Sequence, residues 1–274
     1  MNRKQYALVM LALLLVNPAH AAIKNLFGKT DGQIKKAITS LVTKGKKVKH
    51  ALNIHFQEKE HAILQKIKNK YGISDQVWNE SRAQDDDLVL NDELYKPTSN
   101  ITDYPDEHWI IKKARELIAS YGMNPEKVII RESTEIPVAQ VIAHIHTNSL
   151  THYLDLNVEY LEALTVERCI LNLKHEIMHL WYADSIYADS IIDLMYKNSL
   201  DPLYIEYTKN QEMRADIMAA TESLTDALNY YDWLSKCKPD DTDDNNHPIF
   251  TKRLKAAERL YNYLLIEAEV INAA

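Results

Sequence analysis

Five consecutive residues carry the clearest chemical signal in this chain of 274 residues: His175-Glu176-Ile177-Met178-His179, an HExxH motif. On a helix, residues four apart lie on nearly the same face and one turn apart, so His175 and His179 can bind one metal ion. Glu176 lies between them and can reach a metal-bound water without being a ligand itself. The pattern predicts a zinc hydrolase with one Zn²⁺ per chain, two histidine ligands and Glu176 as the general base.

Apolar residues at helical spacing surround the motif and would hold it on a rigid, buried helix. Thr165 is a suitable N-cap, and we expect the helix to run from there through Leu180. The apolar side chains available for packing are Ile170, Leu171, Leu173, Ile177 and Leu180. The alternative is a pair of surface histidines on an ordinary helix, which this apolar context disfavours.

A catalytic zinc needs a third protein ligand. The extended metzincin motif would place Gly at position 182 and His at position 185, but this chain has Tyr182 and Ser185. That subclass is therefore excluded. A glutamate from a following helix is the alternative source of the ligand.

Two acidic pairs in the C-terminal part have a suitable spacing: Glu212 with Asp216, and Glu222 with Asp226. In either pair the Glu would bind zinc, while the Asp one turn later would accept the N–H of a ligating histidine and orient its ring. The spacing alone does not separate the two pairs. Because a small residue such as Ala215 allows a close approach of two helices, we favour Glu212 and Asp216.

The segment from Glu212 to Asp216 resembles the E-x-x-A-D signature of the HtpX-like, CAAX-prenyl-protease-type zinc endopeptidases (peptidase family M forty-eight, gluzincins). In that family the two helices are followed by a His-Pro pair, with an arginine six residues after the histidine. This chain has His247-Pro248 and Arg253 in that order and spacing. The resemblance covers roughly residues 106–262.

This resemblance implies a zincin-like fold and zinc endopeptidase activity on peptide or protein substrates. It also implies a role for each matching residue. By this likeness, His175, His179 and Glu212 are zinc ligands, Glu176 is the base, Asp216 supports a ligating histidine, and His247 lies near the site as a transition-state or gating residue. A related gluzincin would keep the same chemistry.

The elements that must position these residues can be predicted from local patterns. Residues 127–132, 140–146 and 152–157 alternate in polarity or are rich in β-branched side chains, which indicates three short strands. A helix beginning near Trp109 should precede them and stop at Gly122. After Leu180 the chain should be helical almost to its end, with breaks near Pro202 and over residues 239–248. The expected fold is α+β, mostly α: a zincin-like catalytic domain with a small β-sheet and an HExxH helix.

Residues 1–21 are typical of a secretory signal peptide. Arg3 and Lys4 precede an apolar run over residues 6–16, and Ala19-His20-Ala21 forms a small-x-small cleavage site. This run is shorter than the roughly 20 residues that a transmembrane helix needs. We therefore expect an exported protein, periplasmic or extracellular, with no transmembrane segment in the mature chain.

The mature chain should then contain three parts: a basic helical segment over residues 22–72, a linker over residues 73–105, and the zinc metallopeptidase domain over residues 106–274. The basic segment favours a pair of amphipathic helices with a solvated lysine face. The alternative for this segment is docking, either as peripheral contact with an anionic surface or on the acidic remainder of the same chain. The linker assignment depends on the acidic run at residues 85–87 and on two prolines that follow it.

Composition excludes several classes of function. The chain has a formal net charge of −7 and only five glycines, too few and too scattered for a dinucleotide-binding or P-loop phosphate cradle. No aromatic and basic pattern indicates a nucleic-acid partner. The two cysteines, Cys169 and Cys237, are predicted on separate helices; export permits a disulfide, but their predicted separation favours free thiols.

Three histidines lie on the predicted strands. His144 and His146 share one strand face, and His152 begins the next strand. They could form a second metal site, but ordinary strand positions near a substrate cleft are favoured.

The sequence thus predicts an exported zinc metalloendopeptidase. The competing hypotheses are an exported zinc-binding chaperone or interaction protein without proteolytic turnover, and a helical protein without a metal.

Overall fold

The computed structural model describes residues 31–96, 107–136, 138–146 and 149–221, with a few short stretches between residues 228 and 259. It divides into two compact units. Of the described residues, the central unit contains those within 59–215, and the terminal unit contains those within 31–58 and 216–259. None of the helices described is long and apolar enough to cross a membrane.

The described part of the chain is mostly helical and contains one small sheet, so the predicted α+β, mostly α, class is confirmed. Two short 3-10 turns, η1 (Glu93–Tyr95) and η2 (Pro125–Lys127), connect regular elements. The helices are α3 (Asp31–Tyr71), α4 (Asp75–Asn91), α5 (Trp109–Ser120), α6 (Val158–Glu162), α7 (Val166–Trp181), α8 (Asp184–Leu194) and α9 (Pro202–Ala220), and the strands are β1 (Val128–Glu132), β2 (Ala139–His146) and β3 (Ser149–Leu156).

The sheet has the strand order β1-β3-β2, with β3 in the centre. β1 runs parallel to β3 and β2 antiparallel to it, so Leu154 faces Ile130 on one side and Val141 on the other. The three strands lie within a few residues of their predicted positions. The buried face of β3 packs in one core with α5 and α7, whose members include Leu154, Leu156, Leu117, Ile118, Cys169, Leu173 and Ile177.

Local signals set the ends of α5 and α7 as expected. The Thr165 hydroxyl accepts a hydrogen bond from the backbone N–H of Arg168 at 3.4 Å and caps α7, which ends at Trp181. Helix α5 ends at Ser120, and Gly122 follows with φ 82°, a left-handed conformation that glycine adopts without steric cost. The predicted break near Pro202 is also present, because α9 begins there.

The prediction that residues 73–105 form an irregular linker is wrong over residues 75–91, which form α4. The Ser74 side chain caps this helix by accepting from the N–H of Val77 at 3.3 Å. The acidic run that suggested a loop is partly used in packing: Asp85 is buried and accepts from the Ser190 hydroxyl of α8 at 2.6 Å, and Asp86 accepts from Tyr187 at 2.9 Å. Residues 97–106 lie outside the described part.

The basic segment also differs from its prediction, because residues 31–71 form one helix of 41 residues rather than a pair. A single glycine at position 45 costs a helix about 1 kcal/mol, too little to end one of this length. Within the central unit, Ile63, Leu64 and Ile67 of α3 pack against apolar side chains of α4, α8 and α9. The lysines at positions 59, 66 and 70 are exposed, as expected for a solvated face.

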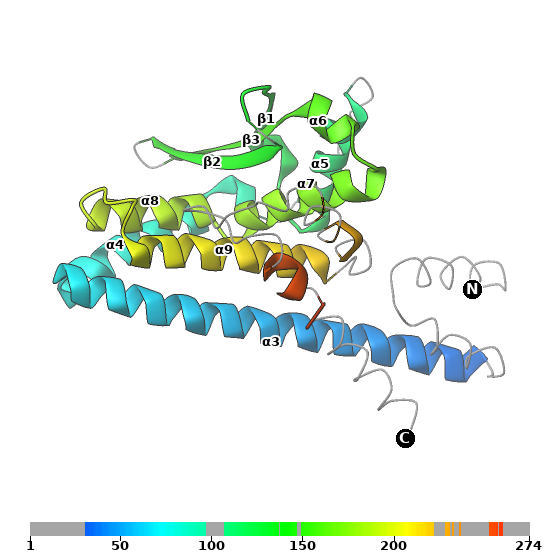
Figure 1. The fold of residues 1–274 in the computed structure, drawn as a ribbon, viewed down its shortest axis with the longest axis horizontal. Coiled ribbons are helices and arrows are strands. Elements are labelled where there is room, and N and C mark those ends of the chain that lie inside the picture. The colour runs from blue at the N-terminus through cyan, green and yellow to red at the C-terminus, as the bar shows by residue number, and fades with distance from the viewer. Residues whose placement is uncertain are drawn as a thin grey trace. The chain divides into compact units, whose positions relative to one another are not determined.

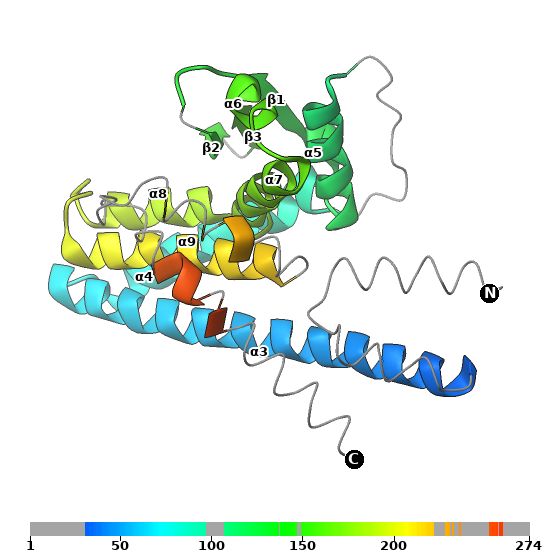
Figure 2. The ribbon, with the colours of Figure 1, turned by 45° about the vertical axis from the view of Figure 1, so that its right-hand side comes forward.

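The central unit is layered, as Figures 1 and 2 show. Helices α7 and α8 lie between the sheet and the part of α9 that belongs to this unit. Strand β2 packs on both α7 and α8, and α5 packs on α7. Helix α7 therefore contacts the sheet on one side and faces α9 on the other, which places its HExxH residues between two layers.

Candidate metal centre

His175 and His179 lie one turn apart on α7, and both imidazoles are buried. Their Nε2 atoms are 3.2 Å apart, and the rings meet edge to face with an interplanar angle of 80°. The spacing of four residues gives this arrangement directly, because both side chains leave the helix on the same face. Both Nε2 atoms therefore point at the same position in space.

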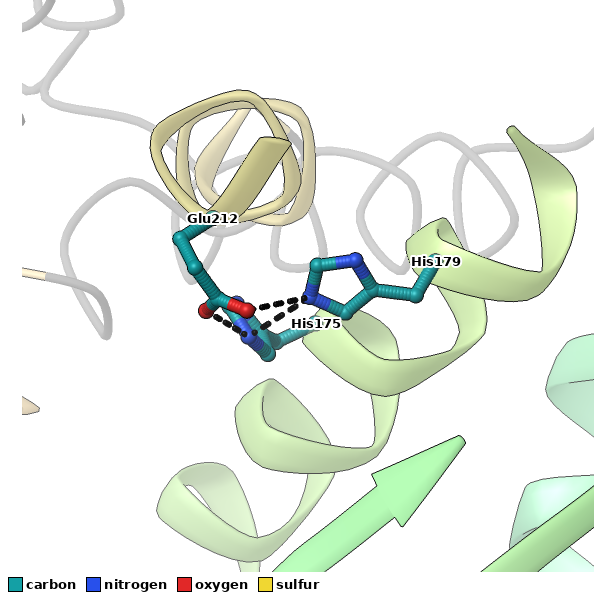
Figure 3. A group of neighbouring side chains, drawn as sticks. All are labelled: His175, His179 and Glu212. Atoms are coloured by element: carbon teal, nitrogen blue, oxygen red, sulfur yellow. Dashed lines mark hydrogen bonds and ion pairs between the residues drawn. The ribbon is translucent and has the colours of Figure 1, made fainter. Parts of the chain in front are cut away.

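Glu212 of α9 brings a carboxylate to that position (Figure 3). Its Oε2 lies 3.2 Å from Nε2 of His175, and its Oε1 lies 3.4 Å from Nε2 of His179. A tetrahedral zinc with bonds of 2.0–2.1 Å holds its N and O ligand atoms about 3.3 Å apart. The two Nε2 atoms are separated by about that distance, and each lies at a similar distance from one of the two Glu212 oxygens. His175, His179 and Glu212 could therefore hold a metal ion together.

The electrostatics of the cluster also suit a cation. Burial favours the neutral form of Glu212, but the imidazoles of His179 and His175 outweigh it and hold the carboxyl pKa well below its usual range. Burial likewise disfavours a charged His179, but the carboxylates of Glu212 and Asp184 outweigh it and hold its pKa well above its usual range. The surroundings therefore favour one buried positive charge beside Glu212, which is what a metal ion would supply. Two imidazoles and one carboxylate are a common donor set of catalytic zinc.

Glu176 lies beside this cluster and outside the ligand set. Its Oε1 is 4.0 Å from Nε2 of His175, and its side chain is 15% exposed to solvent. A carboxylate at this distance is adjacent to the ligand position without sharing it, as the prediction of a base beside the metal requires. The structure thus brings together four of the predicted site residues: His175, Glu176, His179 and Glu212.

Asp184 is a member of the site that the sequence analysis missed. Its Oδ2 lies 2.8 Å from Nδ1 of His179. Because a carboxylate only accepts, Nδ1 donates and Nε2 is left as the nitrogen that faces Glu212. Asp184 is the first residue of α8, and Ala183 just before it has φ 54°, a left-handed turn that directs the chain back toward α7. The sequence signal was an aspartate five residues after the second histidine.

Asp216, the predicted partner of a ligating histidine, belongs to the terminal unit. Both of its carboxylate oxygens accept hydrogen bonds from the guanidinium of Arg253, which lies in the same unit. Asp216 and Arg253, both of which match the family pattern, are therefore paired with each other. A role of Asp216 toward a ligating histidine stays a prediction.

Several predicted residues lie outside the described part of the chain. They include His247, the competing pair Glu222 and Asp226, and Cys237. Cys169 is described: it is a free, buried thiol, and burial raises its pKa to about 11, which does not suit a nucleophile at neutral pH.

The described strand histidines do not converge on a second metal site. In the sheet register, His152 faces Ala143 whereas His144 faces Thr151, so the two imidazoles leave the sheet on opposite faces. His152 is buried with Nε2 3.1 Å from Oδ1 of Asp92, and the exposed His144 stacks edge-on against Tyr153. Both are ordinary strand positions, the favoured alternative.

Comparison with known proteins adds no relative to this picture: no protein-family model, no curated protein and no solved structure matches the chain. The geometry of the site therefore carries the functional argument.

Proposed function

We propose that this protein is an exported zinc metalloendopeptidase with His175, His179 and Glu212 as the zinc ligands and Glu176 as the general base. The observation that carries the proposal is the convergence of the two Nε2 atoms, 3.2 Å apart, on the Glu212 carboxylate, whose oxygens lie 3.2 Å from His175 and 3.4 Å from His179. Glu176 lies 4.0 Å from Nε2 of His175. The HtpX-like resemblance and a zincin-like fold belong to the same proposal, as does an exported, periplasmic or extracellular location.

In the proposed reaction, zinc supplies Lewis-acid chemistry when bound, polarising the scissile carbonyl and lowering the pKa of a water toward 7. Glu176 accepts the proton of the attacking water and then donates it to the amine that leaves. His175, His179 and Glu212 would hold the zinc, and Glu176 lies beside that position, where it can accept the proton of the water. Asp184 keeps the His179 ring in the orientation that ligation needs.

A feature of the sheet supports a peptide as the substrate. Strand β2 is at the edge of the described sheet, paired with β3 on one side, and it packs on α7. On the outer side of β2 the Val141 carbonyl accepts from the Ser185 hydroxyl at 3.3 Å, and the other backbone N–H and C=O groups of this edge are those that an extended peptide would pair with. A peptide bound in this way would use backbone hydrogen bonds, which all sequences provide.

The test is a comparison of wild-type protein with Glu176→Gln, measuring bound zinc and cleavage of a mixed peptide library. We expect Glu176→Gln to retain one zinc per chain and to lose cleavage by a factor of about 10²–10⁴, the usual worth of a positioned base. Glu167→Gln is the matched control, because Glu167 is an exposed residue on the same helix. Loss of zinc from folded Glu176→Gln would reject its role as a non-ligand.

A second outcome would favour the competing class of function. A wild-type protein that binds zinc tightly and cleaves no member of the library would be a zinc-binding chaperone or interaction protein. A wild-type protein without zinc affinity would overturn both hypotheses.

A further inference from the structure

We propose that Arg214 and Glu60 are positioning residues of the metal centre, and that they act on His179 through Asp184. The inference rests on the proposed zinc centre. It adds two residues that hold Asp184 in place, one of which, Glu60, belongs to the basic helix α3. Glu60, Arg214, Asp184 and His179 all belong to the central unit.

Arg214 occupies the middle of a buried chain of charges. Its Nη1 donates to Oε2 of Glu60 at 2.7 Å, and its Nη2 donates to Oδ1 of Asp184. The guanidinium also lies over the ring of Tyr182, 4.1 Å from the centroid. Arg214 and Asp184 are each only 4% exposed, so solvent does not compete for these bonds.

The contacts fix the plane of the Asp184 carboxylate. Oδ1 accepts from Arg214 and from Nε2 of Gln211 at 3.2 Å, which leaves Oδ2 as the oxygen that faces His179. Rotation of the carboxylate would break bonds on both oxygens. Because Asp184 orients His179, whatever holds Asp184 also sets the direction of the Nε2 ligand atom.

Glu60 completes the arrangement from α3. It occupies Nη1 of Arg214, so the guanidinium presents Nη2 to Asp184. Burying an unpaired carboxylate is costly, and the guanidinium of Arg214 offsets this cost for both Glu60 and Asp184 because it lies between them. By this inference Glu60 makes α3 part of the support of the metal centre. Proteolytic removal of a segment that contains Glu60 would therefore weaken zinc binding.

The chain offers a matched control on the same two helices. Lys66 of α3 and Glu206 of α9 form an ion pair at 3.6 Å, with side chains 56% and 41% exposed. This pair links α3 to α9 as Glu60 and Arg214 do, but it has no bond to Asp184. Variants of the Lys66–Glu206 pair therefore report the effect of losing an ion pair between α3 and α9. Variants of Glu60 and Arg214 report in addition the effect of losing support for His179.

The experiment measures the zinc affinity of the full chain by competition with a chelator, and the absorption spectrum of the Co²⁺-substituted protein, which reports ligand geometry. We expect Arg214→Met to weaken zinc binding by about 10–100-fold and to alter the Co²⁺ spectrum, the usual effect of losing an outer partner of a ligand. Glu60→Gln should weaken binding by a smaller factor. Lys66→Met and Glu206→Gln should leave both measurements at their wild-type values.

The double variant makes the test sharp. If Glu60 acts through Arg214, then Glu60→Gln should cause no further loss of affinity in the Arg214→Met background. Wild-type affinity in Arg214→Met, or full additivity of the two losses, would overturn the inference. Should Arg214→Met fail to fold, Glu60→Gln alone decides, since an unchanged affinity and spectrum would also overturn it. Absence of zinc binding in the wild type would instead reject the metal centre itself.

Discussion

Two buried histidines of the central unit, His179 and His152, each have an aspartate as a close partner, but only His179 belongs to a group that could hold a metal ion. The imidazole–carboxylate distance is 2.8 Å for His179 with Asp184 and 3.1 Å for His152 with Asp92. Burial and a carboxylate partner are thus common to both. They do not by themselves distinguish a ligand from a structural residue.

The difference lies in which nitrogen faces the acid and what faces the other nitrogen. In His179 the aspartate takes Nδ1, and Nε2 points at His175 and Glu212. In His152 the aspartate takes Nε2, the nitrogen farther from the backbone, and the ring meets Tyr95 edge to face at 5.7 Å. What distinguishes His179 from His152 is therefore that its second nitrogen converges with other donor atoms.

The largest expected effect comes from alanine at the two kinds of histidine. His175→Ala removes a proposed ligand, so zinc affinity should fall by more than the 100-fold or so that loss of an outer partner costs. His152→Ala should retain one zinc per folded chain although it destabilises the fold. Zinc content after gel filtration, measured at a temperature where both variants are folded, checks this. Equal zinc loss from His152→Ala would break the comparison.

An intermediate effect is expected from Asp184→Asn. Asn has only one acceptor oxygen, so it cannot accept from both Arg214 and Nδ1 of His179 as the two carboxylate oxygens do. Zinc affinity should therefore fall by about 10–100-fold. The measurement is chelator competition, with circular dichroism to show that the metal-free variant is folded. Unchanged affinity would mean that Asp184 packs against the site without supporting its ligand.

The smallest expected effect on zinc belongs to Asp92→Asn, which should leave zinc affinity unchanged and lower the free energy of unfolding by about 1–3 kcal/mol. This loss should depend on pH. Burial raises the pKa of Asp92, but hydrogen bonds from His152 and from the N–H of Leu94 outweigh it, and the net pKa lies below its usual value.

The lowered pKa of Asp92 sets how its contribution to stability changes with pH. The carboxylate of Asp92 stays ionised to lower pH in the folded chain than in the unfolded chain, so its stabilisation is present above about pH 4. It is lost as the pH falls through the lower folded-state pKa. Urea unfolding from pH 3 to 7 should therefore show wild type and Asp92→Asn converging at the acid end. A difference that grows toward low pH would contradict the assignment.

Elements with strong local signals were predictable from the sequence. The three strands, the Thr165 cap and the stop at Gly122 depend on neighbouring residues and on the period of apolar positions, and all were found in place. The convergence of Glu212 with the two histidines was also predicted, because small residues beside an acidic one on a helix indicate close packing.

What the sequence did not reveal depends on partners far away in the chain. The acidic run at residues 85–87 suggested a loop, because the hydroxyl groups that donate hydrogen bonds to Asp85 and Asp86 lie on α8, about a hundred residues later. Asp184 went unnoticed for a related reason: a left-handed turn, not a helical period, brings it back to His179. No local pattern predicts that an alanine will adopt such a conformation.

That alanine restricts how the sequence can vary. A β-carbon in the left-handed region costs roughly 1–2 kcal/mol, and a branched side chain would cost more. Ala183 is also enclosed, with its methyl group packed in a small cluster beside Ala143 and Ile186. Glycine would relieve the strain but lose this contact and gain freedom in the unfolded chain, so the two effects nearly offset each other. Across homologues, position 183 should therefore alternate between alanine and glycine while Asp184 after it stays fixed.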